Sequence, residues 1–287
     1  ENFEIYISAV NANDIRRLTY SDSLEFNPVW SPHHYDIVFE SNQTGNPDLF
    51  LMNVTTGISQ QLTRHPSADI NPSWSSINPT IITFQSNRSG KWQLYRLDLT
   101  SNVITLLSDG SANDTMPIYA HHSDQIVFLS DRDGDGSALY LLNEDGSSER
   151  ISDSSGGVLN HVWAPDDSLI AYQSDLTGIP QVYVYEPSTH RTRRVTGDDE
   201  TVDSVPSYAP TFRCSGSAVV VYTSNIGNQS DVFQSLTRPL ESASINVVQE
   251  AINLTNDAQA NDGYPQGLTN IKSNFARLIN ASVDWTD

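Results

Sequence analysis

The chain has 287 residues, of which 35 are acidic and 15 basic, so its formal net charge at pH 7 is −20. This charge argues against nucleic acid as a partner, because phosphate binding depends on clustered Lys and Arg. No apolar run approaches the roughly 18 residues of a membrane span, so we expect no membrane insertion. The single cysteine, Cys214, excludes an intramolecular disulfide and any zinc or redox site built from cysteines.

The first predicted elements are two short strands at 4–10 (EIYISAV) and 15–19 (IRRLT). Both match the third and fourth strands of a repeat that begins at residue 20, and no matching first or second strand precedes them. We therefore expect 1–19 to be the outer strands of an incomplete unit. The chain starts at Glu1 without a signal peptide, which we interpret as the beginning of a mature chain or of an excised domain.

A proline–aromatic–small step then recurs along the chain at a nearly constant interval. Its copies are NPVWSP (27–32), NPSWSS (71–76), MPIYAH (116–121), NHVWAP (160–165) and VPSYAP (205–210). The second residues of these copies are 44, 45, 44 and 45 positions apart. A period in the forties, with four short strands in each unit, is typical of a β-propeller blade.

The second copy shows the strand pattern most clearly. Its first strand opens with PSWSS, and the next three are predicted at 81–86, 92–99 and 101–108, with a turn at 87–90. Applied to the other copies, this pattern predicts full blades at 20–63, 64–108, 109–152, 153–196 and 197–255. The once-per-blade aromatic residues are expected to pack between sheets.

The C-terminal segment, 256–287, is expected to complete the unit that 1–19 leaves unfinished. We predict degenerate closing strands here, although Ile271, Phe275, Leu278 and Ile279 are at helical spacing and leave a terminal helix open. The fold prediction is thus a single all-β domain over 1–287. It is a six-bladed propeller of four-stranded antiparallel blades, with the sixth blade split between the two termini.

Acidic residues concentrate in the loops that join one blade to the next. In a propeller these loops share one face, so their charges would form a rim that favours a basic partner or a cation. The alternative is that each Asp only caps a turn. The candidate partner-binding residues are Asp69, Asp114, Asp198, Asp199, Glu200, Asp203 and Asp262, together with His161, which replaces the repeat's proline at the channel mouth.

The segment SDRDGDGSALY (130–140) is the sharpest local motif. Asp131, Asp133 and Asp135 alternate, and Gly136 takes the sixth position, as in the first half of a calcium-binding loop. The twelfth position is Leu142 rather than Glu, so the segment is not an EF-hand. Two interpretations stay open, a tentative calcium site formed by the three aspartates and a plain acidic hairpin turn. No other cofactor is predicted.

The repeat unit resembles the WD-like repeat of TolB-type propellers. The resemblance rests on LT, eight or nine residues, P-x-W-S-P, then I-x-F-x-S, G and L-Y, and it covers about residues 1–265. It implies a six-bladed propeller and a periplasmic or extracellular bacterial protein. TolB-type proteins also carry a separate N-terminal α/β domain, and we expect no such domain within residues 1–287. Related repeats occur in the gating propellers of prolyl-oligopeptidase-type peptidases and in a few polysaccharide lyases.

The sequence carries no nucleophile or phosphate-binding signature, because G-x-S-x-G, H-E-x-x-H and the P-loop are all absent. We therefore expect a non-catalytic module, a monomer that binds a basic protein or peptide with its acidic loop face and channel mouth. The alternatives are a polysaccharide lyase or glycosidase acting in the channel through His161, or the propeller part of a larger peptidase or signalling protein.

Overall fold

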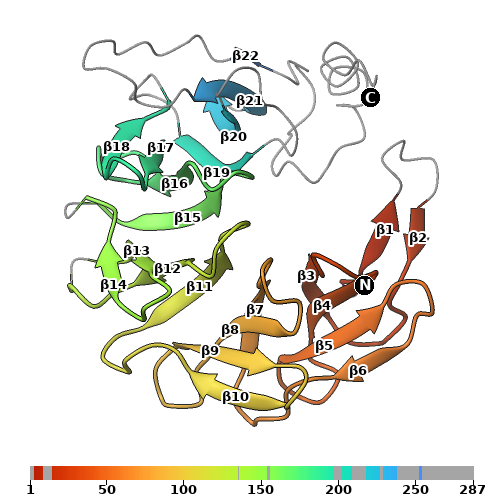
Figure 1. Cartoon of the computed structure of the whole chain (residues 1–287). Helices are drawn as coiled ribbons and strands as arrows, with labels where there is room; N and C mark the ends of the chain where they lie inside the picture. Colours follow the sequence, from red (N-terminus) through yellow and green to blue (C-terminus); the bar gives the residue numbers. More distant parts are fainter. Residues whose placement is uncertain are drawn as a thin grey trace, which may run out of the picture. The chain divides into compact units, whose positions relative to one another are not determined.

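The computed structural model describes residues 3–8, 15–134, 136–153, 156–196, 202–208, 218–226, 229–237 and 252–253. These residues form strands, turns and loops without a helix (Figure 1). In the same part of the chain, no helix is long and apolar enough to cross a membrane. The chain divides into two compact units, one of Glu1–Gly134 with Leu139–Arg150, the other of Asp135–Ala138 with Ile151–Asp287.

The first unit contains a hairpin and three four-stranded antiparallel sheets, each with its strands in chain order. The hairpin pairs β1 (Tyr6–Ser8) with β2 (Ile15–Arg17). The sheets are β3 (Glu25–Trp30), β4 (Asp36–Ser41), β5 (Asp48–Asn53) and β6 (Ser59–Gln61); β7 (Asp69–Trp74), β8 (Ile81–Ser86), β9 (Gln93–Asp98) and β10 (Val103–Leu106); and β11 (Asp114–Tyr119), β12 (Ile126–Ser130), β13 (Ala138–Leu142) and β14 (Ser148–Arg150).

The second unit contains two more sheets of the same kind. Their strands are β15 (Val158–Trp163), β16 (Ile170–Ser174), β17 (Gln181–Glu186) and β18 (Arg191–Arg194); and β19 (Val202–Tyr208), β20 (Ala218–Ile226), β21 (Gln229–Thr237) and β22 (Ile252–Asn253). The predicted all-β class with four-stranded antiparallel sheets is confirmed. The predicted closing segment, 256–287, lies outside the described residues.

A β-bulge interrupts the first strand of every four-stranded sheet. In the first three sheets the register shifts next to a proline, and the residue before that proline has positive φ: Asn27 (46°), Asn71 (52°) and Met116 (53°). A bulge leaves one residue outside the ladder, which suits a proline because it has no N–H to donate. The recurring proline of the sequence thus marks a bend in the inner strand.

A Thr or Ser that follows the fourth strand ties this strand to the third in the first, second and fourth sheets. The hydroxyl of Thr63 accepts a hydrogen bond from the Leu49 amide at 3.0 Å, and Ser108 and Thr196 play the same role in later sheets. In the β1–β2 hairpin, Thr19 accepts the Ile5 amide at 2.9 Å. The hairpin thus shares this hydrogen bond with the outer strands of the sheets, and its assignment to an incomplete blade stays a prediction.

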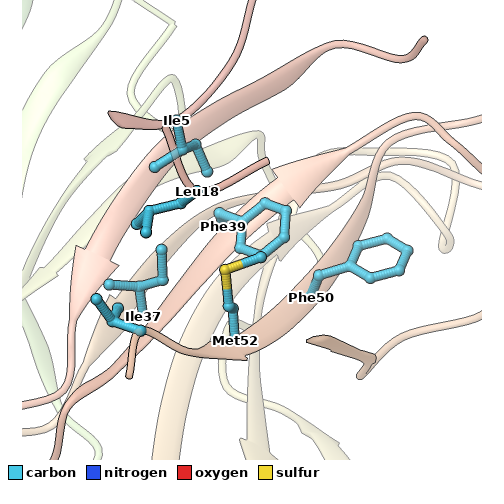
Figure 2. Close-up of a cluster of buried hydrophobic side chains, with 7 residues drawn as sticks. Ile5, Leu18, Ile37, Phe39, Phe50 and Met52 are labelled. Atoms are coloured by element: carbon cyan, nitrogen blue, oxygen red, sulfur yellow. The ribbon is translucent and has the colours of Figure 1, made fainter. Parts of the chain in front are cut away.

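Two apolar clusters cover the two faces of the first sheet. On one face, Ile5 and Leu18 of the hairpin segment pack with Phe39 and Phe50 (Figure 2). On the other face, Val38 and Leu49 contact Trp74 of the next sheet.

The repeated aromatic residue was expected to pack between sheets at every copy. Trp74, Tyr119 and Trp163 are buried, but Trp30 is 50% exposed. Trp30 belongs to the first sheet, whose described neighbour on the hairpin side consists of outer strands only. No described inner strand covers this ring.

Candidate partner-binding site at the loop ends

In the second and third sheets the first strand begins with a residue that was predicted to form the acidic rim, Asp69 and Asp114 respectively. Asp69 pairs with Ser86 across the ladder, and Asp114 with Ser130. Both aspartate side chains are fully buried. The sequence placed them correctly at loop ends, but the fold turns their carboxylates inward.

Each of these two carboxylates binds an arginine of its own sheet. Nη2 of Arg88 donates to both carboxylate oxygens of Asp69, at 2.7 and 2.8 Å. Nη2 of Arg132 donates to those of Asp114 at 3.0 and 3.2 Å. A basic partner would have to compete with these internal arginines for either aspartate. Their role in partner binding stays a prediction.

The arginines are also held by a serine and two aromatic rings. Arg88 Nε donates to Ser86 Oγ at 3.1 Å, and its guanidinium lies 5.5 and 4.7 Å from the ring centres of Phe84 and Tyr95. Arg132 repeats this arrangement. Sequence reasoning missed these arginines, although the S-x-R steps at 86–88 and 130–132 were visible signals.

Glu25 takes the same place in the first sheet, opposite Ser41. It is 4% exposed, and its Oε1 accepts hydrogen bonds from Ser21 and Ser41. The residue in the arginine's position is Gln43, which is exposed. Oε2 of Glu25 has no hydrogen-bond partner among the residues that the structure describes.

The second unit departs from this charged arrangement. Val158 takes the acid's place opposite Ser174, and Leu176 takes the arginine's place. In the next sheet Asp203 lies opposite Ser224, is 2% exposed, and donates its backbone N–H to the Pro180 carbonyl at 2.9 Å. The remaining predicted rim residues, Asp198, Asp199, Glu200 and Asp262, lie outside the described residues.

His161 lies in β15 opposite Tyr172 and is 5% exposed. Its side chain is therefore buried against neighbouring residues and does not face solvent. Burial raises the pKa of the neighbouring Tyr172 hydroxyl. The predicted ligand role of His161 at a channel mouth is not tested by this placement.

A polar network links the inner strands of the first unit. Glu40 Oε1 accepts from Asn27 Nδ2 and from the Asn71 amide, both at 2.7 Å. Asn71 Nδ2 donates to Gln85 Oε1 at 3.0 Å, and Gln85 Oε1 also accepts the Met116 amide at 2.6 Å. Burial raises the pKa of Glu40, although both of its hydrogen bonds act in the opposite direction.

In the candidate calcium loop, the carboxylates of Asp131 and Asp133 accept hydrogen bonds from other protein groups. Asp131 accepts the backbone and side-chain N–H groups of Asn113, both at 2.7 Å, and these bonds lower its pKa. Asp133 accepts from the Tyr140 hydroxyl and from Arg150 Nη1, and its pKa is lowered. Asp135 lies outside the described residues. A calcium ion here would have to replace these donors, and the site stays a prediction.

The comparisons with known proteins agree with this repeat architecture. The family described as "TolB beta propeller domain" matches residues 1–108. The chain has the fold of a TolB-like β-propeller. A Protein TolB homolog of Chlorobium luteolum is 27% identical over 191 residues, which are 66% of this chain and 33% of that protein. A second, from Chlorobaculum tepidum, is 29% identical over 82 residues, 29% of this chain and 19% of that protein. The chain thus spans a third or less of the length of these relatives.

Solved structures show the same fold. TolB from Acinetobacter baumannii superposes with a TM-score of 0.65 at 22% identity, covering 81% of this chain and 56% of that one. An oligogalacturonate lyase in complex with manganese gives 0.64 at 15% identity, covering 89% of this chain and 74% of that one. At such low identity these likenesses show the TolB-like propeller fold alone, because one propeller scaffold hosts unrelated activities.

Proposed function

We propose that this TolB-like propeller is a non-catalytic module that binds a protein or peptide through its loop ends and inner strands. A periplasmic location accords with the TolB relatives. A partner with basic groups accords with the net charge of −20. The module could equally form part of a larger protein, since it spans only part of its relatives.

The observation that carries the proposal is an exposed apolar residue directly after the buried first position of the inner strand. In the first sheet this is Phe26, which is 36% exposed and contacts the ring of Phe3 at a centroid distance of 5.3 Å. In the fourth sheet it is Leu159, which is 48% exposed. The exposed rings of Phe3 and Phe26 form a contiguous apolar patch in the first unit, and such a patch is typical of a binding surface.

Polar groups suited to a peptide lie beside these apolar residues. Asn27 follows Phe26 in β3, is itself exposed, and belongs to the network with Glu40 and Asn71. Amide side chains both donate and accept, so they can bond the N–H and C=O groups of an extended chain. Aromatic residues flanked by such groups are the usual composition of a protein interface.

The proposal is tested by pull-down from native extract, with bound proteins identified by mass spectrometry. The bait is the wild-type chain beside the double variant Phe26→Ser, Leu159→Ser. Tyr35→Ser is the matched control, because Tyr35 is 75% exposed but lies in the turn at the opposite end of β3. We expect one stoichiometric protein with wild type and Tyr35→Ser, and its loss with the double variant.

A second bait, carrying Asp198→Asn, Asp199→Asn and Glu200→Gln, tests the predicted acidic rim. Asp203 is left unchanged because it is buried. Equal capture by every folded bait would contradict a binding surface at these loop ends. Turnover of polygalacturonate by the purified chain would overturn the non-catalytic assignment in favour of a lyase.

A further inference from the structure

Three sheets of the first unit share one buried arrangement at the loop end of their second strand. Each has an acid at the start of the first strand, a serine opposite it, and two aromatic rings in contact. The ring pairs are Phe39 with Phe50, Phe84 with Tyr95, and Phe128 with Tyr140, with centroid distances of 5.8, 5.9 and 5.7 Å. Figure 2 shows Phe39 and Phe50 in the cluster that includes Ile5 and Leu18.

In two of these sheets an arginine completes the arrangement. The guanidiniums of Arg88 and Arg132 each bind the carboxylate, the serine hydroxyl and both rings, with 17% and 19% of the side chain exposed. Planar stacking combined with a bond to a carboxylate is the recognition that suits a guanidinium better than an ammonium. These two sheets therefore show what ligand this arrangement fits.

The first sheet has the acid, the serine and the rings, but its turn carries Gln43 where the arginine stands elsewhere. The turn has the same backbone hydrogen bond in both sheets. The backbone N–H of Gln43 donates to Ser41 Oγ at 3.2 Å, and that of Arg88 donates to Ser86 Oγ at 3.3 Å. Ser41 Oγ donates to Glu25 Oε1, and Oε2 of this buried carboxylate has no partner among the described residues. A buried carboxylate oxygen without a donor is costly.

We propose that the Glu25–Ser41–Phe39–Phe50 arrangement binds the guanidinium of an arginine from the partner. The inference rests on the proposed function and specifies its chemistry. The incoming arginine takes the position that Arg88 and Arg132 hold in their own sheets, and bonds to Glu25 Oε2. Glu25, Phe39 and Phe50 are each 4% exposed or less in the free chain, so the incoming guanidinium enters by a local shift of the side chains that cover them. The exposed Gln43 marks the loop side, where a chain lying along Phe3 and Phe26 would pass.

The first experiment titrates the chain with N-acetyl-arginine amide by saturation-transfer NMR. N-acetyl-citrulline amide, which has the same shape without the charge, is the matched ligand. We expect binding of the arginine compound at least tenfold stronger than that of citrulline. Glu25→Gln should abolish the preference, whereas Gln43→Ala should keep it. Equal binding of both ligands by wild type, or an unchanged preference in Glu25→Gln, would overturn the inference.

Gln43→Arg provides an independent test by recreating the arrangement of the next two sheets. We expect its Tm to rise by roughly 2–4 °C, because the new guanidinium pairs a buried carboxylate oxygen. Binding of N-acetyl-arginine amide should be lost at the same time. A lower or unchanged Tm together with wild-type binding would mean that another group already holds Glu25, and would overturn the inference.

The partner pull-down separates this inference from the proposed function. We expect Gln43→Arg to weaken capture of the partner at least tenfold, while Gln43→Ala captures it as wild type does. Capture by Gln43→Arg at wild-type strength would overturn the arginine site and leave the binding function standing. If wild type captures no partner, the proposed function fails whatever the small-molecule titration shows.

Discussion

The sheets β7–β10 and β15–β18 are two copies of one repeat that stabilise the same corner by opposite means. In the first, Asp69 and Arg88 form a buried ion pair over two aromatic rings. In the second, Val158 and Leu176 replace both partners, and the rings of Tyr172 and Tyr183 remain in contact at 5.6 Å. Either a complete charged pair or a complete apolar pair is compatible with this backbone.

In the second copy, Gly156 lets the loop before β15 lie directly against Leu176, the apolar residue in the arginine's place. A Cβ on Gly156 would lie 2.5 Å from Cα and 2.7 Å from N of Leu176, so the two loops approach more closely than any side chain allows. The corresponding position before Asp69 is Ser67. The comparison teaches that the repeat specifies the backbone, while each copy satisfies its buried corner with its own set of neighbours.

The largest effect is expected when one partner of the charged pair is removed. Arg88→Met leaves Asp69 buried without its cation, which typically costs about 3–5 kcal/mol. The free energy of unfolding, measured by urea denaturation, should fall by this amount. Arg64→Met, away from the described ion pairs, serves as the control. A loss below about 1 kcal/mol would show that the β7–β10 sheet does not depend on its ion pair.

The next largest effect is expected in the apolar copy. Gly156→Ala should cost roughly 1–3 kcal/mol, because its Cβ meets backbone atoms of Leu176 that cannot move aside cheaply. Gly157→Ala is the matched control, since its Cβ would lie 3.4 Å from a side-chain oxygen of Asp175. Equal midpoints for the two variants in a urea titration would contradict the close approach of the loops.

Converting the charged copy into the apolar one sharpens the comparison. The double variant Asp69→Val, Arg88→Leu should lose about 1 kcal/mol or less, far below the sum of its single variants. A double-mutant cycle, with each variant followed by urea denaturation, measures the difference. Additive losses would show that the apolar solution depends on Gly156 or other residues specific to the fourth sheet.

The smallest effect concerns a carboxylate and an amide at one repeat position, Glu40 in β4 and Gln85 in β8. Burial raises the pKa of Glu40, so its protonation favours the folded state and this contribution is lost as the pH rises through the folded pKa. Glu40→Gln should therefore stabilise the protein slightly above that pKa, with no advantage below it. Tm measured across pH 4 to 8 checks this, with Gln85→Glu expected to destabilise at the high end.

Much of the fold followed from periodicity, because a repeat every 44 or 45 residues reports strand order without any knowledge of contacts. The strands of each repeat, the Thr or Ser at its end and the hairpin at 4–19 were all predictable in this way. The site was less so. Asp69 and Asp114 were correctly placed at loop ends, but their burial depends on Arg88 and Arg132, which sit 19 and 18 residues later in the chain.

The sequence by itself determined the repeat, the all-β class and the acidic character of the loops, since these depend on local patterns and composition. Only the tertiary structure decided which acids face solvent and which are neutralised. The sequence shows whether an arginine or a leucine follows the second strand, but it does not show whether that residue neutralises a buried carboxylate. A carboxylate's burial and partners are set by side chains brought together across the sheet. For Glu25 the described residues supply two serine hydroxyls and two nearby rings but no cation.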